Sequence, residues 1–335
     1  MRCMHGATLS CFPAHISRWL WAAICVGVIA LQMDRPGIAC EHAQPPRKEM
    51  PGFADDEASF IDAMQTASEG ACYLVLKDFR PHLSDHQKAT LQQIRIRITP
   101  SREADRVFAR GEGSERRIEI SVGFLMAGSL VSDLQVFQNL QNGQDRTWDY
   151  VSYIATSLIK NSRADGERSS KIALKSFPTF LGFNATKERE LYSDPRIYKI
   201  RSYLNVEALA LILAHELSHH FLDHVGKTEL SLDLKRLQEA EADRLAVRLA
   251  IASGHNPLLG IYPFLLYVAM EENFRIDPSQ RDYPEPGCRV GGMIDAGIVS
   301  FYEDNGFIQH LKTTGEFETW DRSMRTLREE FRLHC

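Results

Sequence analysis

The residues of this chain with the clearest chemical potential are His215, Glu216 and His219, which form the pattern H-E-x-x-H. On a helix, positions four apart lie on one face, about one turn from each other. His215 and His219 can then direct two imidazoles at one metal ion. Glu216 lies on an adjoining face, close enough to act on a water held there. Two neutral nitrogen ligands, an open coordination position and a carboxylate base are the requirements of metal-assisted hydrolysis.

The stretch around this motif, residues 205–225, is predicted to be a helix that Asn205 caps and Gly226 ends. The alternative to a metal site is a polar helix with two solvated histidines. The helix is otherwise apolar, through Leu209, Leu211, Ile212, Leu213, Leu217 and Phe221. Because a helix this apolar is usually buried, and buried histidines need partners, the pattern favours the metal site.

A second set of carboxylates follows on the next expected helix. A zinc ion that carries out hydrolysis uses three protein ligands plus water, so two histidines are not enough. Glu239 and Asp243 are four positions apart and share a face. Glu239 is predicted to be the third ligand, and Asp243 to accept the outer N–H of a zinc-bound histidine. The alternative is a solvated helix face. Glu241 is expected to face away from Glu239 and Asp243. The predicted metal site requires neither His220 nor His224 as a ligand.

These two motifs together carry a family resemblance. HELSH followed by EAEADRLA resembles the gluzincin metallopeptidases, which carry H-E-x-x-H and a later E-x-x-x-D. The E-x-x-A-D form, and the stretch IEISVGFL at 118–125, are similar to the group of HtpX, BepA and the CAAX prenyl proteases. The gap between the two motifs is closer to thermolysin, or to the ImmA-type peptidases that cleave phage repressors. The resemblance covers about residues 117–126 and 203–290.

The resemblance implies a fold as well as a reaction. We expect an α+β, mainly α, zincin-type metallopeptidase domain with a small antiparallel sheet beside the metal-binding helix. The strand at 117–122 would be its edge, where an extended substrate can add by β-pairing. Residues 127–200 would be an insertion between this strand and the metal helix.

The same resemblance points to two further catalytic residues. In the HtpX and CAAX-protease group, a segment after the third helix carries His-Pro and then Arg, both facing the metal. Here the segment 282–289 has a similar layout, with Tyr283 in the histidine position and Arg289 following. A tyrosine O–H can donate to a developing oxyanion. The alternative is a Pro-rich loop with a surface arginine.

The predicted function is a zinc-dependent endopeptidase that acts on a protein or peptide substrate. His215, His219 and Glu239 would hold Zn²⁺, and Glu216 would be the general base. Two alternatives remain open. One is a catalytically silent zinc-fold module for binding or chaperone-like activity, and the other is a cytosolic peptidase of the repressor-cleaving or phage-exclusion type.

The N-terminal region indicates export. Residues 19–33 are an uninterrupted apolar stretch with Arg18 before it, which is typical of an export signal, and 37–39 resemble a cleavage site. An uncleaved signal anchor, with membrane association through 19–33, is the alternative. We therefore expect a periplasmic or extracellular protein, or a membrane-anchored one with its catalytic domain outside. A translation start at Met33 would instead make the protein cytosolic.

Length and composition fit this organisation. The chain has 335 residues, 44% of them hydrophobic, and a net charge of −5, with no long basic run that would suggest nucleic acid. We divide it into a signal or anchor at 1–40, a polar linker at 41–54 and the metallopeptidase domain at 55–335. The sequence leaves the oligomeric state open.

Four cysteines lie outside the leader: Cys40, Cys72, Cys288 and Cys335. In an oxidising compartment they predict two disulfides, with three pairings open. None has C-x-x-C spacing, which argues against a thiolate zinc site.

Periodicity predicts the remaining elements. Strict alternation at 94–99 and 117–122 indicates two strands, which we expect to pair as a long hairpin. The aromatic stretch 177–183 is interpreted as core packing, with a substrate-lining loop as the alternative. Further helices are predicted at 55–80, 85–93, 145–161, 232–253, 256–273, 291–303 and 317–333, and loops at 163–171 and 277–291.

Overall fold

The computed structural model describes residues 57–101, 107–112, 115–137, 140, 146–164, 172–227, 230–274 and 286–332. The predicted leader and linker lie outside these ranges, and so do Tyr283, Cys40 and Cys335.

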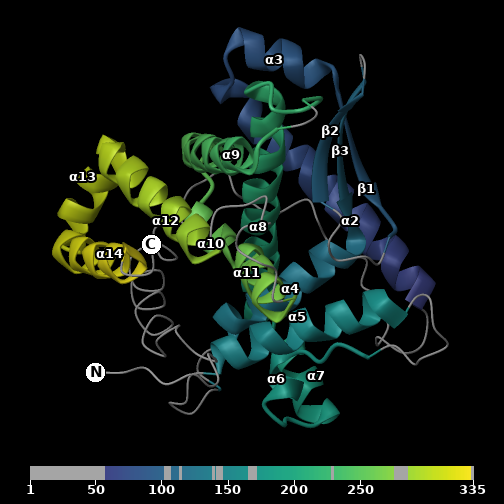
Figure 1. Ribbon diagram of the computed structural model, residues 1–335. Helices are drawn as coiled ribbons and strands as arrows, with labels where there is room; N and C mark the ends of the chain where they lie inside the picture. Colours follow the sequence, from purple (N-terminus) through teal and green to yellow (C-terminus); the bar gives the residue numbers. More distant parts are fainter. Residues whose placement is uncertain are drawn as a thin grey trace, which may run out of the picture.

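The described part of the chain is mainly helical, with one three-stranded sheet. Helix α8 (Pro195–Phe221) runs through the centre of the molecule, with the sheet on one side and the C-terminal helices on the other (Figure 1). The other helices are α2 (Glu57–Phe79), the short η1 (Arg80–His82), α3 (Asp85–Gln92), α4 (Val122–Val136), α5 (Thr147–Ala164), α6 (Phe177–Phe180), α7 (Ala185–Ser193), α9 (Leu232–Ala252), α10 (Pro257–Gly260), α11 (Tyr262–Phe274), α12 (Pro286–Glu303), α13 (Asn305–Thr314) and α14 (Phe317–Arg332).

The sheet is mixed rather than antiparallel. Its strands are β1 (Ile94–Thr99), β2 (Val107–Glu112) and β3 (Glu115–Ser121), in the order β1-β3-β2. β1 and β3 are the two predicted strands, but they pair in parallel, so the predicted hairpin between them is wrong. The antiparallel partner of β3 is β2, a strand that lies between the two predicted strands and was not itself predicted. Alternation reveals that a segment is a strand but not which neighbour it pairs with.

This order also corrects the expected edge strand. β3 lies in the middle of the sheet, so it is not the edge beside the metal helix. β2 is an outer strand, and it packs against α8. Gly111 of β2 lies so close to the chain after α8 that an added Cβ would be 3.3 Å from a methyl carbon of Val225.

The central helix α8 begins ahead of the predicted start. The Asp194 side chain accepts from the backbone N–H of Arg196, and Pro195 opens the first turn. Asn205 is therefore not a cap. It lies inside the helix, where its amide donates to Ser129 Oγ at 3.1 Å. Tertiary packing explains this difference, because α4 and α7 both pack on α8 and support the added turns.

The helices that follow α8 agree more closely with the sequence analysis. The predicted second helix is α9, and Gly254 follows it with a positive φ of 84°. The predicted third helix opens at Pro257 and breaks between α10 and α11, next to Pro263. The predicted loop at 277–291 extends too far, because α12 begins at Pro286 and Arg289 is helical.

The segment 127–200 holds most of α4, then α5, α6, α7 and the start of α8. Within its aromatic stretch, Phe177 is fully buried, with its ring centroid 5.0 Å from that of Tyr150, and Phe180 and Leu181 are half-buried against the core. This agrees with the core-packing interpretation of 177–183.

The two described cysteines differ. Cys72 is a free, buried thiol, and burial together with the nearby Glu69 raises its pKa to about 11. Cys288 is disulfide-bonded. Every pairing of the four cysteines into two disulfides includes Cys72, so the prediction of two disulfides is wrong. Cys72 packs inside α2 as part of the apolar core, and a thiol there is inert.

No helix within the described ranges is both long and apolar enough to span a membrane, and residues 19–33 lie outside them.

Candidate metal centre

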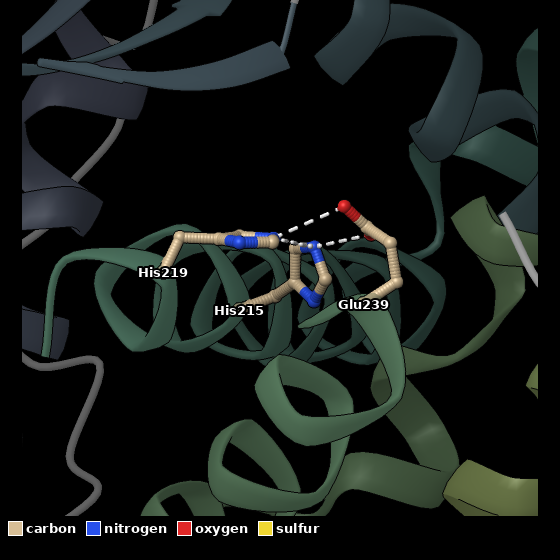
Figure 2. A group of neighbouring side chains, drawn as sticks. All are labelled: His215, His219 and Glu239. Atoms are coloured by element: carbon tan, nitrogen blue, oxygen red, sulfur yellow. Dashed lines mark hydrogen bonds and ion pairs between the residues drawn. The ribbon is translucent and has the colours of Figure 1, made fainter. Parts of the chain in front are cut away.

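Three predicted metal ligands converge where α8 and α9 pack together. His215 and His219 project from the same face of α8, and Glu239 reaches them from α9 (Figure 2). His215 Nε2 lies 3.1 Å from His219 Nε2 and 3.4 Å from Glu239 Oε2. His219 Nε2 lies 3.3 Å from Glu239 Oε1. Three such ligand atoms within 4.8 Å of one another can hold a metal ion.

The orientation of His215 is set from behind by Asp243. Its Nδ1 lies 2.8 Å from Asp243 Oδ1, and both side chains are buried. Because a carboxylate is an acceptor, Nδ1 carries a proton, and Nε2, which faces the cluster, is the nitrogen whose proton a metal ion would replace. The contact predicted for Asp243 is therefore present in the structure.

Arg289 also reaches the centre, from α12. Its guanidinium meets Asp243 through two contacts: Nε to Oδ2 at 2.9 Å and Nη2 to Oδ1 at 3.1 Å. Nη2 is also 3.2 Å from Glu239 Oε2 and 3.2 Å from His215 Nε2. Phe264 covers the same guanidinium, with the ring centroid 5.3 Å from Cζ. Arg289 is thus not a surface residue, and its contacts suit a group that orients the two carboxylates.

The electrostatics of the cluster favour positive charge at its centre. Burial opposes a charged His215, but Asp243 and Glu239 outweigh it and raise the pKa of the imidazolium to about 10. Burial also opposes the charge of the two carboxylates. His215, His219 and Arg289 outweigh it for Glu239, and Arg289 and His215 for Asp243, so the pKa of each lies below its ordinary value. Both carboxylates are therefore ionised beside the ligand nitrogens at neutral pH, as a cation site requires.

Glu216 is buried next to the same groups. Its exposed fraction is 7%, and burial raises its carboxyl pKa above the ordinary value, while the neighbouring histidines pull the pKa down. A raised pKa suits a carboxylate that must take up a proton and release it again.

The structure adds two residues that the sequence analysis set aside, His224 and Glu241. His224 Nδ1 lies 3.2 Å from His219 Nδ1, and His224 Nε2 lies 3.3 Å from Glu241 Oε2. Burial and the neighbouring His219 lower the pKa of His224, so the ring is neutral at neutral pH. Glu241 is 42% exposed and is not one of the three clustered side chains, and its link to the site runs through His224. Its position along α9 predicts the helix face on which Glu241 lies, but not that His224, from the turn after α8, contacts that face.

His220, also set aside as a ligand, ties the metal helix to the sheet. Its Nε2 is 3.2 Å from the carbonyl oxygen of Arg117 in β3, and burial lowers its pKa to about 4. Arg116 of the same strand donates to the carbonyl of His220 at 3.0 Å. A neutral His220 can donate to the strand, so the end of α8 is anchored on β3.

The structure thus brings together His215, Glu216, His219, Glu239, Asp243 and Arg289 from three helices. Tyr283 lies outside the described residues. Comparisons with protein-family models, with curated proteins and with solved structures find no match for this chain.

Proposed function

We propose that this protein is a zinc-dependent endopeptidase. The observation that carries the proposal is the spacing of three side chains. The Nε2 atoms of His215 and His219 lie 3.1 Å apart, and a Glu239 carboxylate oxygen lies 3.4 Å from the first (Oε2) and 3.3 Å from the second (Oε1). A four-coordinate ion with bonds of ~2.0–2.1 Å sets its ligand atoms ~3.3 Å apart. Three protein ligands leave one position for water or substrate, which is the arrangement of a hydrolytic rather than a structural zinc site.

The residue types support zinc over harder ions. Two imidazoles and one carboxylate suit zinc, whereas calcium and magnesium sites are built from oxygen atoms. A bound zinc ion supplies Lewis acidity, which lowers the pKa of a water molecule towards about 7 and polarises a peptide carbonyl.

The chain's own groups perform the remaining steps. Asp243 holds the Nδ1 proton of His215 and so keeps Nε2 directed at the site. Glu216 accepts the proton of the attacking water and then delivers it to the leaving amine, which regenerates the carboxylate. Arg289 holds Asp243 and Glu239 in place through its two ion pairs. Donation by Tyr283 or Arg289 to the oxyanion remains part of the proposal.

The position of the sheet suggests how an extended substrate binds. β3 is flanked on both sides, whereas β2 is an outer strand that packs against the metal helix. A peptide can add a strand only at an outer edge. We therefore assign substrate pairing to β2, in place of β3.

The test uses a peptide library digested by the full chain and read by mass spectrometry. We expect cleavage by the wild type, loss of cleavage with a chelator, and recovery when zinc is restored. Glu216→Gln should keep its zinc and lose at least about a hundredfold in rate, because only the base is altered. Glu190→Gln, an exposed glutamate on α7, is the matched control.

Two results would argue against this function. If Glu216→Gln cleaves as fast as the Glu190→Gln control, the assigned base is wrong. If the wild type binds zinc but cleaves no peptide, the catalytically silent binding module is the better description.

A further inference from the structure

The second metal ligand, His219, has a supporting chain of its own. Its Nε2 faces Glu239 at 3.3 Å, while its Nδ1 points the other way and lies 3.2 Å from His224 Nδ1. The two rings meet edge to face, with centroids 5.3 Å apart. Beyond His224, the Nε2 atom reaches Glu241 Oε2 at 3.3 Å. The imidazole of His224 is 5% exposed and the Glu241 side chain is 42% exposed, so this series of contacts runs from the buried site to the protein surface.

The backbone after α8 is shaped to bring His224 into this position. Helix α8 ends at Phe221, and Asp223 adopts a left-handed conformation with φ 53°, which is uncommon for a residue other than glycine. This turn sends the chain back, so that the N–H of His224 bonds to the carbonyl of His219 at 2.8 Å. Arg116 of β3 holds the turn through an ion pair with Asp223 at 2.9 Å.

The hydrogen-bonding roles along this chain can be assigned in one direction. If Nε2 of His219 binds a metal, its Nδ1 carries the proton and needs an acceptor. The Nδ1 of His224, 3.2 Å away, is in position to accept this hydrogen bond, which places the proton of His224 on Nε2. The Nε2–H then donates to Glu241, a carboxylate that ends the chain as a pure acceptor.

We propose that His224 and Glu241 are positioning residues that orient metal ligand His219, as Asp243 orients His215. The two supports are alike in origin, because Glu241 and Asp243 both project from α9. They differ in how they contact the ligand. Asp243 contacts His215 directly, whereas Glu241 contacts His224, which in turn contacts His219. The inference rests on the proposed metal site but not on the peptidase reaction.

The test is metal affinity, measured with the full chain. Apoprotein is titrated with Zn²⁺ in competition with a chromophoric chelator, and the visible spectrum of bound Co²⁺ reports the ligand geometry. Two variants distinguish the hydrogen-bond acceptor of His224 from the packing of its ring. His224→Asn keeps an acceptor oxygen near the Nδ1 position, and His224→Phe keeps a buried ring without an acceptor. His310→Ala, an exposed histidine on α13, is the control for loss of a histidine elsewhere.

We expect His224→Phe to bind Zn²⁺ about 10–100-fold more weakly than the wild type, as for other partners behind a metal ligand. His224→Asn should recover most of that loss and the wild-type Co²⁺ spectrum. Glu241→Leu should weaken binding less than His224→Phe, and Glu241→Gln should be close to the wild type, because its amide oxygen still accepts.

Three results would overturn the proposal. The first is equal Zn²⁺ affinity in His224→Phe and His310→Ala. The second is a His224→Asn variant no better than His224→Phe, which would mean that ring packing matters rather than the acceptor. The third is a wild-type protein without Zn²⁺ affinity, which would remove the metal site itself. A wild type that binds Zn²⁺ without cleaving peptides would count against the peptidase alone.

Discussion

At the scale of single residues, Glu239 and Asp243 share one face of α9 but have different partners. Glu239 Oε1 and Oε2 lie 3.3 and 3.4 Å from the site-facing nitrogens of the two histidines. Asp243 touches His215 on the opposite nitrogen. These positions fit the proposal that Glu239 is a metal ligand and that Asp243 orients the ligand His215.

This difference predicts that substituting Glu239 lowers Zn²⁺ affinity much more than substituting Asp243. Glu239→Ala should lose the metal almost entirely, because a site with two ligands is incomplete. Asp243→Ala should weaken Zn²⁺ affinity about 10–100-fold, as expected for an outer partner. Asp233→Ala, an exposed residue near the start of α9, is the control and should bind normally. Metal content after dialysis and a competition titration give both values, and equal retention in Glu239→Ala and Asp233→Ala would contradict the ligand assignment.

Of the residues at the candidate site, the pairs on α8 and α9 could be predicted from the sequence, whereas His224 could not. Spacings of four along one helix identified the two histidines on α8 and the two carboxylates on α9, because helical geometry alone relates such pairs. His224 is five positions after His219, a spacing that shares no helical face. Its role depends on the turn at Asp223, which hydrophobic periodicity does not reveal.

At the scale of elements, the metal helix is held in place by close packing against its neighbours. The short helix α10 approaches α8 at Gly260, where an added Cβ would lie 2.5 Å from the carbonyl oxygen of Glu207. The Glu207 side chain, 1% exposed, accepts from the backbone N–H of Asn256 at 2.6 Å. This contact fixes α10 on α8 ahead of the metal ligands.

Gly260→Ala should therefore destabilise the protein by about 1–3 kcal/mol, because α8 and α10 must move apart. The matched control is Gly292→Ala in α12, where an added Cβ meets no atom within 4 Å. There, alanine should be neutral or stabilise by up to about 1 kcal/mol, because glycine is the poorer helix former. Denaturant unfolding of both variants gives the comparison. A Gly260→Ala protein as stable as Gly292→Ala would show that the approach is not tight.

At the scale of the whole molecule, the candidate metal centre joins elements that are distant in the sequence. Its groups come from α8, α9 and α12, and the end of α8 is anchored to β3 through His220. The unfolded chain cannot present this arrangement. A bound ion therefore stabilises the native state selectively.

Thermal unfolding should show this coupling. Free Zn²⁺ at 100 times its dissociation constant should stabilise the wild type by about 2.7 kcal/mol, and a chelator should remove the gain. The Tm of Glu239→Ala should not respond to either addition. The same zinc-dependent rise in Tm for both proteins would mean that the ion binds somewhere else.

A second prediction at this scale concerns the N-terminal region. The apolar stretch 19–33 and the small residues at 37–39 predict an export signal that is removed after Ala39. Mass spectrometry of the mature protein from cells expressing the full sequence should give an N-terminus at Cys40. A retained leader would favour a signal anchor, and a start at Met33 would contradict export.

The sequence by itself determined the features that depend on neighbours along the chain. The proposed metal ligands, the presence of helix α3 and the core position of Phe177 all follow from local spacing and composition. Only the tertiary structure decided which segments meet. It paired β1 with β3 in parallel, made β2 the outer strand, and folded His224 back onto His219. Strand partners and chain reversals are selected by packing between residues far apart in sequence, and local periodicity carries no information about that packing.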